Sequence, residues 1–312
     1  MKRNPISNPT AQHPYFNIQY SLLSGEQLHS HMIRNLFKNY LIEHNNEGSG
    51  KASSYLRALD LLSVMLRIKP YSFSDCADIW SVNSVERLHQ LRLFVLDEQK
   101  NLINNPWDNE KIPPSYLRDG FCSAALRILI EFHTQNHYTS HVLETLKKYN
   151  SDYDALKHKL NTEPAYPDFL VRDPNSQDGK ELIREAKVRI GQQAFRKMIL
   201  QIYQNRCCIT GLNIPTVNRA SHIIPWAKRK NTRMDPCNGL CLSATYDAAF
   251  DRHLISLDKD YRLLVSRDIS DHYSSQSVND HFLQRVGSPI ELPIQHAPKQ
   301  KYLEEHRQVG NF

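Results

Sequence analysis

The sequence predicts a two-domain α+β protein, in which a helical N-terminal module precedes a C-terminal domain built from a strand pair and helices. Apolar residues recur at helical spacing between Ser54 and Gln135, which indicates the helical module. The segment 151–180 is rich in Pro, Asp and Asn, which is typical of an interdomain linker. In the C-terminal domain, 181–312, a long helical pattern over Glu181–Arg206 leads through CCITG into a strand pair that carries the sequence SHIIPW.

Residues 1–50 are polar and mixed, and we expect roughly the first fifteen to form a loose tail. A short helix is predicted over 20–43. Its apolar positions are Leu22, Leu23, Leu28, Met32, Leu36 and Leu41. The Asn/Gly/Ser-rich stretch that follows is expected to break this helix before the module begins.

The module over 51–150 is expected to contain about four helices. The first starts at a serine cap, Ser54, and stops at Pro70, because proline cannot continue a helix. The other helices are predicted over Ser74–Val82, Ser84–Asn101 and Ser115–Gln135.

Basic residues give the first of these helices a positive character, namely Lys51, Arg57, Arg67 and Lys69. One interpretation is that the module contributes to DNA grip or target choice. An equally supported interpretation is a dimerisation or purely structural module, since helical bundles serve unrelated tasks.

Composition limits the class of protein. The formal net charge is +6, a mild basic excess that is compatible with nucleic acid without requiring it. The N-terminus lacks an apolar signal segment, and no apolar run approaches the ~20 residues that span a bilayer. We therefore expect a cytoplasmic protein, without membrane association, whose six cysteines are reduced.

The residues that carry chemistry lie in SHIIPW and in NGLCLSATYDAAFD. Asn238 lies sixteen residues after His222, and Asp247 and Asp251 follow at nine and thirteen residues past Asn238. If residues 245–251 begin a helix, the two carboxylates share one face and can hold one cation. A hard ion such as Mg²⁺ prefers oxygen ligands, and a free imidazole at His222 could take a proton from water. This pattern indicates phosphodiester hydrolysis.

Several motifs occur in one order: RIGQQAFRKMILQIYQNRCCITG, RASHIIPWAKRK and DPCNGLCLSATYDAAFDRHLIS. Together they resemble the HNH endonuclease family, and more narrowly its predicted restriction endonuclease branch. The resemblance covers about 180–268, and the tail 291–312 is also similar. It implies a ββα-metal unit, two strands and a helix around one divalent cation.

Carried over by position, His222 resembles the general base and Asn238 the residue that ties the loop to the base-bearing strand. Asp247 occupies the place of the third family residue, and Asp251 that of a further metal ligand. Aspartates at these ligand positions favour Mg²⁺ or Mn²⁺ over softer metals. Ser221 stands where the family often has a His or Asp ligand, and a hydroxyl is a weak ligand.

Many HNH proteins hold a structural zinc on two Cys-x-x-Cys pairs. In this sequence, Cys207 and Cys208 are adjacent, and three residues separate Cys237 from Cys241. Adjacent cysteines point apart and do not easily share a tetrahedral ion. We expect buried thiols here and no structural zinc.

Residues for gripping DNA are expected beside the histidine. Lys228, Arg229, Lys230 and Arg233 crowd the loop after SHIIPW, and Arg252 follows Asp251 directly. Tyr246 either bonds the substrate or packs. His306 could reach the site from the C-terminus, but a structural hydrogen bond is the favoured role.

The sequence thus predicts a divalent-metal-dependent HNH endonuclease that cuts double-stranded DNA, in restriction or anti-phage defence. One alternative is a catalytically silent DNA-binding protein with the same fold, which Ser221 and the absent histidine at 247 would favour. Another is a toxin or RNA-directed nuclease. Cutting both strands with one site per chain argues for a homodimer, which the sequence leaves open.

Overall fold

The computed structural model describes residues 25–44, 50–101, 105, 107, 112–161 and 179–312. The expected N-terminal tail and the first positions of the helix predicted over 20–43 lie outside these residues. The chain divides into two compact units, Met1–His133 and Thr134–Phe312. The division falls inside a helix instead of at the predicted boundary near residue 150. Each unit is described by itself.

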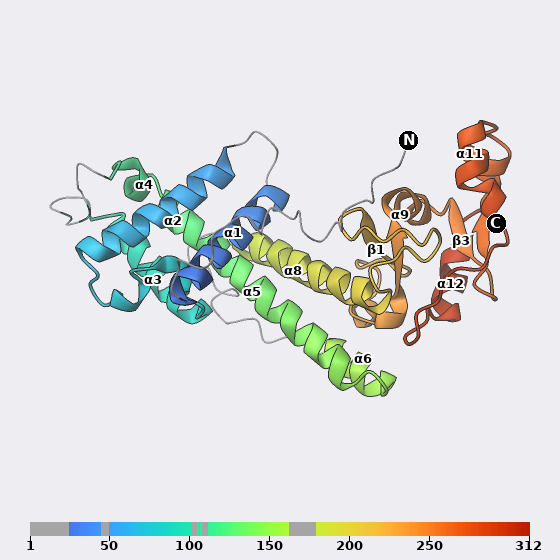
Figure 1. Cartoon of the computed structure of the whole chain (residues 1–312), viewed down its shortest axis with the longest axis horizontal. Coiled ribbons are helices and arrows are strands. Elements are labelled where there is room, and N and C mark those ends of the chain that lie inside the picture. The colour runs from blue at the N-terminus through green and yellow to red at the C-terminus, as the bar shows by residue number, and fades with distance from the viewer. Residues whose placement is uncertain (1–24, 45–49, 102–104, 106, 108–111, 162–178) are drawn as a thin grey trace, which may run out of the picture. The chain divides into compact units, whose positions relative to one another are not determined.

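The first unit is helical, as expected. Its helices, coloured blue to green in Figure 1, are α1 (Gly25–His44), α2 (Lys51–Ile68), α3 (Val85–Glu98), α4 (Ser115–Arg118) and the beginning of α5 (Phe121–Lys148). Two short 3-10 turns, η4 (Ser74–Cys76) and η5 (Ile79–Ser81), stand where one short helix was predicted. Asp78 caps the start of η5, because its carboxylate accepts a hydrogen bond from the backbone N–H of Trp80.

Two predicted helix boundaries in this unit were wrong. Helix α2 begins at Lys51, and the Ser54 hydroxyl donates to the Gly50 carbonyl 3.0 Å away instead of capping the helix start. The helix predicted over Ser115–Gln135 is interrupted at Gly120, whose φ of 79° is left-handed. Such a conformation ends a helix, so α4 and α5 are separate elements.

The second unit contains two small sheets and the helices that pack on them (Figure 1). After the end of α5 come α6 (Tyr153–Asn161), α8 (Gly179–Ile202), β1 (Asn218–His222), η6 (Lys230–Thr232), η7 (Pro236–Asn238), β2 (Gly239–Ser243), α9 (Ala244–Asp251), β3 (Ile255–Leu257), β4 (Leu263–Val265), α10 (Arg267–Ser270), α11 (Gln276–His281), η8 (Leu283–Arg285) and α12 (Gln300–Arg307). The chain is therefore a mixed helix and sheet protein, as predicted.

The segment 151–180 is not simply a linker. Tyr153–Asn161 form helix α6, and its apolar residues Leu156 and Leu160 are buried in the core of the second unit. The composition of this segment suggested a linker, because its many polar residues outnumber the two leucines that pack into the core. The rest of the predicted linker, 162–178, lies outside the described residues.

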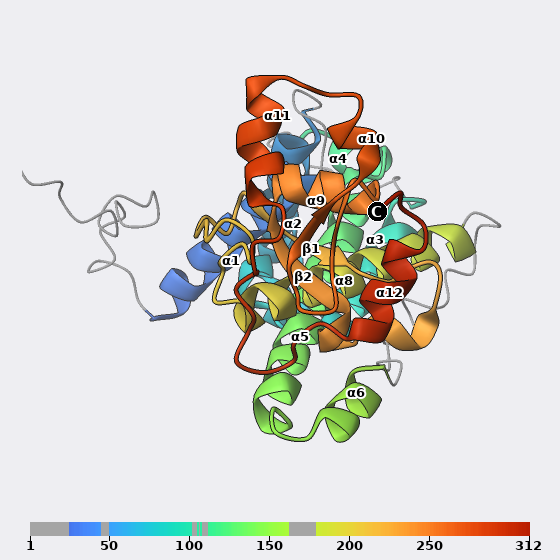
Figure 2. The same cartoon turned by 90° about the vertical axis from the view of Figure 1, so that its right-hand side faces the viewer.

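The first sheet is an antiparallel pair with a fixed register. Asn218 of β1 faces Ser243 of β2, and His222 faces Gly239. Helix α9 begins directly after β2, so the chain passes from strand to helix within one residue. Figures 1 and 2 both place α8, β1 and α9 close together, and Figure 2 shows β2 beside β1. Every residue of β2 is buried, and its sequence, GLCLS, contains no charged side chain.

Two glycines allow helix α8 to approach the strands and their loop. A Cβ at Gly191 of α8 would lie 2.6 Å from the ring of Trp226, in the loop after β1. A Cβ at Gly239 would lie 2.4 Å from the Ile199 side chain and 2.8 Å from that of Phe195, both on α8. Only glycine fits either place without moving these side chains, so the two positions fix how closely α8 packs on the strand pair.

A buried carboxylate joins three separate elements of the second unit. Asp235 has no exposed surface, and one of its oxygens accepts from the hydroxyls of Tyr153 in α6 (2.7 Å) and Tyr302 in α12 (2.8 Å). The Lys157 ammonium lies 3.1 Å from the same oxygen, and the other oxygen accepts from the Cys237 N–H. Helices α6 and α12 are thereby tied to the turn that precedes β2.

We expect Asp235→Ala to lower the free energy of unfolding by about 3–5 kcal/mol, because the half-buried Lys157 ammonium and two tyrosine hydroxyls lose the buried acceptor that they share. Urea denaturation of the full chain measures the change. Asp260→Ala is the control, since the pair of Asp260 with Lys259 is exposed and contributes less than about 1 kcal/mol. Equal effects of the two substitutions would contradict a structural role for the Asp235 cluster.

Candidate active site

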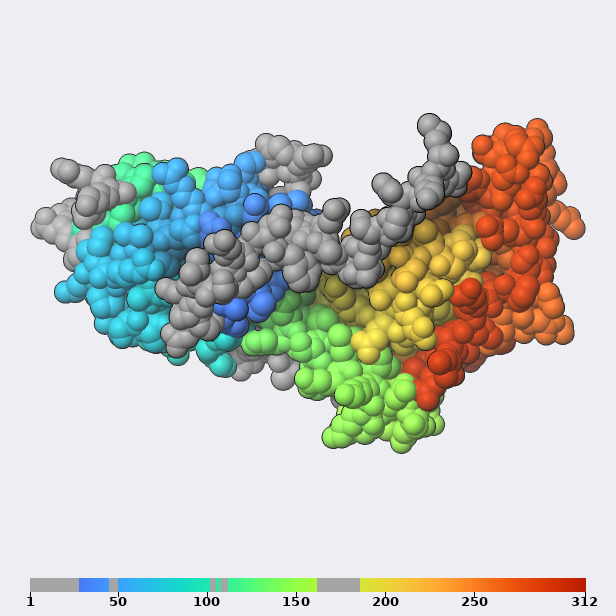
Figure 3. Space-filling view, in the orientation of Figure 1, coloured from blue at the N-terminus to red at the C-terminus, as the bar shows by residue number. Residues whose placement is uncertain are grey.

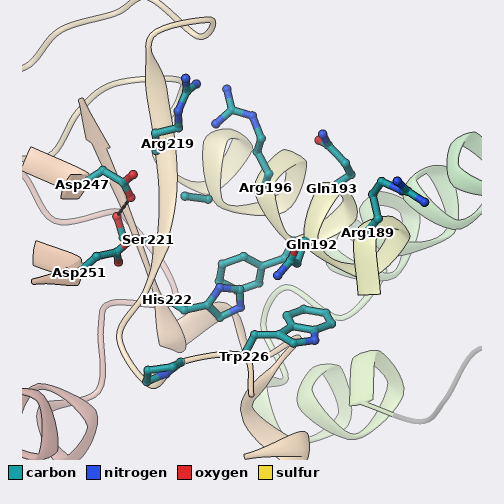
Figure 4. A pocket seen from close by; sticks show the side chains of 13 residues that line it. Arg189, Gln192, Gln193, Arg196, Arg219, Ser221, His222, Trp226, Asp247 and Asp251 are labelled. Atoms are coloured by element: carbon teal, nitrogen blue, oxygen red, sulfur yellow. Dashed lines mark hydrogen bonds between the residues drawn. The ribbon is translucent and has the colours of Figure 1, made fainter. Parts of the chain in front are cut away.

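A cavity of about 590 Å³ in the second unit gathers four of the residues singled out in the sequence. Ser221 and His222 come from the end of β1, and Asp247 and Asp251 from α9. Figure 4 shows Ser221 and both carboxylates on one side of β1, with His222 below them and the side chains of α8 on the other side. The four residues that the sequence motifs singled out therefore line one pocket.

The imidazole of His222 is held in one orientation as a neutral base. Its ring stacks on Phe195 of α8 with centroids 3.6 Å apart, and the edge of Trp226 closes a second side. Nε2 lies 3.0 Å from the Arg233 carbonyl, which can only accept, so Nε2 carries the proton and Nδ1 is left as the acceptor. Burial lowers the pKa of His222 to about 4, so the ring is uncharged at neutral pH.

Asn238 fixes the loop that follows β1. Its side chain is fully buried, with the amide oxygen accepting from the Ile224 N–H (2.8 Å). The amide nitrogen donates to the carbonyls of Ile224 (3.1 Å) and Thr232 (2.9 Å). Thr232 precedes Arg233, whose carbonyl holds the His222 ring. Asn238 therefore acts on the imidazole through the loop and makes no direct bond to it.

The carboxylates lie one helical turn apart on α9. Asp247 accepts a short hydrogen bond from the Ser221 hydroxyl. Burial raises the pKa of Asp251, and the charge of Asp247 raises it further. Two carboxylates that repel each other inside a pocket favour a bound cation.

This donor set fits a hard divalent ion. Asp247, Asp251 and Ser221 offer only oxygen atoms, and Mg²⁺ sites commonly use one or two carboxylates with water and substrate oxygens completing the shell. Across the described part of the chain, no three His, Cys, Asp or Glu side chains form a group that could hold a metal. Any ion here would depend on few protein ligands.

The basic residues predicted to grip DNA lie outside the pocket lining. Arg229 pairs with Glu305 of α12 at 2.8 Å, and Lys228 lies 3.8 Å from the same carboxylate. In Figure 3 the C-terminal segment, in red, lies against the segments that follow α8, in yellow. Arg233 donates to the Trp226 carbonyl and covers the Trp226 ring. Lys230 is exposed, so much of this loop's charge already has partners within the chain.

Three further predicted residues have structural contacts. Arg252 is exposed at the end of α9 and donates to the Ala248 carbonyl. Tyr246 is 3% exposed and its hydroxyl donates to the His281 carbonyl, which supports the packing interpretation. His306 is buried against Phe250, with one ring nitrogen 3.0 Å from the Phe250 carbonyl and the other 3.0 Å from the Ser256 hydroxyl. These contacts support a structural role for His306.

Residues that were not assigned a role from the sequence also line the pocket. They are Arg189, Gln192, Gln193 and Arg196 of α8, and Arg219 of β1. The signal was present, because the first four belong to the RIGQQAFR stretch that carried the family resemblance. Sequence alone did not show that this helix face turns toward His222.

The cysteines of this unit are buried thiols. Cys207, Cys208, Cys237 and Cys241 all have free, buried side chains, and the Cys208 N–H donates to the Cys241 carbonyl. Burial raises the pKa of Cys237 and of Cys241 to about 12.

Comparison with known families identifies this part of the chain. Residues 207–258 match the family model for HNH endonuclease, so the C-terminal part carries an HNH endonuclease domain. The match begins after α8 and covers β1, β2, α9 and β3. An HNH endonuclease domain suggests nuclease activity and implies binding of nucleic acid. No curated protein matches the chain. No helix in the described residues is long and apolar enough to cross a membrane.

The buried His306 makes stability depend on pH. Burial lowers its pKa from 6.5 to about 4, so between these values the unfolded chain binds a proton that the folded chain does not. Stability is then complete above pH 6.5 and falls as the pH drops toward 4, by about 3 kcal/mol for this group. Burial also lowers the pKa of His222 to about 4, so this residue makes the stability fall with decreasing pH in the same way.

Urea denaturation between pH 4.5 and 7.5 measures this dependence. We expect His306→Gln to be less stable than the parent at pH 7.5, because the stacking on Phe250 is lost. The slope of its unfolding free energy against pH should be shallower, by the equivalent of up to one bound proton. An unchanged slope would show that His306 is accessible to protons in the folded chain.

Proposed function

We propose that the C-terminal domain is a divalent-metal-dependent endonuclease that hydrolyses phosphodiester bonds in double-stranded DNA. The observation that carries the proposal is the single pocket in which an oriented, uncharged His222 lies together with Asp247 and Asp251. The HNH family match supports the reaction class. The order of β1, β2 and α9 supports assigning these elements to the family's ββα-metal unit.

His222 is proposed as the general base. Its Nδ1 is the acceptor that can take a proton from an attacking water, while Nε2 stays bonded to the Arg233 carbonyl. Phe195 and Trp226 restrict the ring, so it need not reorient during the reaction. Asn238 is proposed as the positioning residue, since it holds the loop whose carbonyl orients the ring.

Asp247, Asp251 and Ser221 are proposed to hold the cation, Mg²⁺ or Mn²⁺. When bound, the ion would stabilise negative charge on the phosphate oxygens. The Ser221 hydroxyl donates to Asp247 and so keeps this carboxylate turned into the pocket. With so few protein ligands, we expect metal affinity to be weak without substrate.

The competing candidate is a DNA-binding protein that keeps the fold without the chemistry. Ser221 at a common ligand position favours it, as does the lack of any three-ligand group among the described residues. A role in restriction or anti-phage defence is our proposal from the sequence resemblance, and phage plating on cells that express the chain is its test. A homodimer would allow both strands to be cut, and sedimentation tests it.

Replacing His222 by Ala or Gln should lower DNA cleavage by at least about 100-fold, because no other neutral base is oriented in the pocket. The measurement is nicking of supercoiled plasmid with Mg²⁺, with Mn²⁺ and with EDTA. His272→Ala is the matched control, because His272 is exposed and outside the pocket. The Gln variant preserves side-chain volume, and thermal unfolding verifies that both variants fold.

Cleavage by His222→Gln at the parent's rate would assign the base elsewhere. Binding of DNA by the parent without nicking under any metal condition would favour the silent DNA-binding protein.

Removing either carboxylate should weaken metal binding. We expect Asp247→Asn and Asp251→Asn to raise the Mn²⁺ concentration needed for half-maximal cleavage by about tenfold or more, because each removes one of two charged ligands. Direct Mn²⁺ binding to the full chain, followed by calorimetry, gives the second readout. Asp271→Asn, at an exposed carboxylate outside the pocket, is the control. Parent-like Mn²⁺ dependence in both pocket variants would place the ion elsewhere.

A further inference from the structure

One face of helix α8 presents polar side chains to the pocket. Arg189, Gln192, Gln193 and Arg196 are spaced i, i+3, i+4 and i+7, which places them on the same side of a helix. The opposite side carries buried apolar residues that belong to the core, among them Ala194 and Met198. Because the core fixes the apolar side, the polar side is held toward His222.

Arg219 adds a cation from the neighbouring strand. It is exposed, lies two residues before Ser221 on β1 and lines the same pocket. One guanidinium nitrogen donates to the Thr216 carbonyl at 3.1 Å, and it forms no ion pair with any described carboxylate. Arg196 braces the start of this strand by donating to the carbonyls of Asn218 (2.6 Å) and Pro215 (2.7 Å).

The pocket therefore has two sides of opposite charge. Asp247 and Asp251 lie on one side of β1, and the arginines of α8 lie on the other, with Arg219 extending from the strand between them (Figure 4). Carboxylates repel a phosphodiester backbone, so a substrate strand needs cations on the other side. Arginine suits this task, because its planar guanidinium can bind two phosphate oxygens at once.

The loop after SHIIPW is less suited to this task. Its Arg229 and Lys228 share the Glu305 carboxylate, and a phosphate would have to displace this partner. None of the loop's basic residues lines the pocket, whereas Arg189 and Arg219 do.

We propose that Arg189 and Arg219 bind the backbone phosphates of the substrate strand beside the scissile bond. Gln192 and Gln193 add polar contacts, and Arg196 positions Arg219. The proposal deepens the nuclease function proposed above and rests on it. It names the polar face of α8 with Arg219 as the surface that holds the nucleic acid over β1.

The experiment measures binding of a fluorescent duplex of about 20 base pairs to the full chain by anisotropy, from 50 to 200 mM salt. His222→Ala is the background, so that the duplex stays intact in Mg²⁺. We expect Arg219→Gln and Arg189→Gln each to raise Kd about 5–10-fold and to reduce the slope of log Kd against log salt by about 1. Arg219→Lys should restore part of the affinity, because it keeps the charge.

Arg262→Gln is the matched control. Arg262 is exposed, donates to one backbone carbonyl as Arg219 does, and lies outside the pocket. Control-like affinity in both pocket variants, with a large loss in Arg229→Gln, would overturn the proposal in favour of the loop. Absence of duplex binding by the parent would also overturn it.

The two proposals fail separately. Cleavage that depends on His222 but not on Arg189 or Arg219 would leave the nuclease function and remove the phosphate-binding surface. Duplex binding that depends on both arginines, in a chain that never cleaves, would support the phosphate-binding surface and remove the nuclease function.

Discussion

The buried amide of Asn238 is the constraint on which the site depends. Residues 223–238 connect two strands and contain only two short 3-10 turns, so the connection has little regular hydrogen bonding of its own. The Asn238 side chain supplies three bonds that close this connection onto itself. A buried amide left without partners is costly, so the loop conformation and the amide stabilise each other. The carbonyl that orients His222 belongs to this loop.

Helix α8 supports the same loop from outside. Gly191 and Gly239 let the helix approach Trp226 and β2 at distances that any side chain would prevent. That close approach brings Phe195 onto the His222 ring. The glycines of the two sequence motifs thus have a common physical role: they set the spacing between the helix and the strand that carries the imidazole.

Part of the site could be predicted from sequence because it depends on local geometry. Asp247 and Asp251 share a helix face whatever surrounds the helix, and Ser221 and His222 are neighbours on one strand. The contribution of α8 could not be predicted, because Arg189 reaches the pocket through packing of segments about thirty residues apart along the chain. The ion pairs of the basic loop after SHIIPW could not be predicted for the same reason, since Glu305 lies 76 residues from Arg229.

The fold shows the same limit. The helices of the first unit, the long helix before CCITG, the first strand pair and α9 were predicted, whereas β3, β4, α10, α11 and α12 were not. The start of α2 and the break at Gly120 depend on glycine conformations that periodicity does not reveal. Helix α6 was hidden because two buried leucines are a weak signal among polar neighbours. A partner such as Asp235, distant in sequence, is what makes so short a helix stable.

Glu305 gives the C-terminal helix an electrostatic role. By neutralising part of the charge on Lys228 and Arg229, it weakens the field of the loop relative to that of the pocket. A polyanion approaching this domain would then be attracted more strongly toward the uncompensated Arg219 than toward the loop. This would reduce non-productive attachment of the substrate beside the proposed site without any change in the site itself. In the proposed nuclease, helix α12 would thereby help to select where a long charged substrate first makes contact.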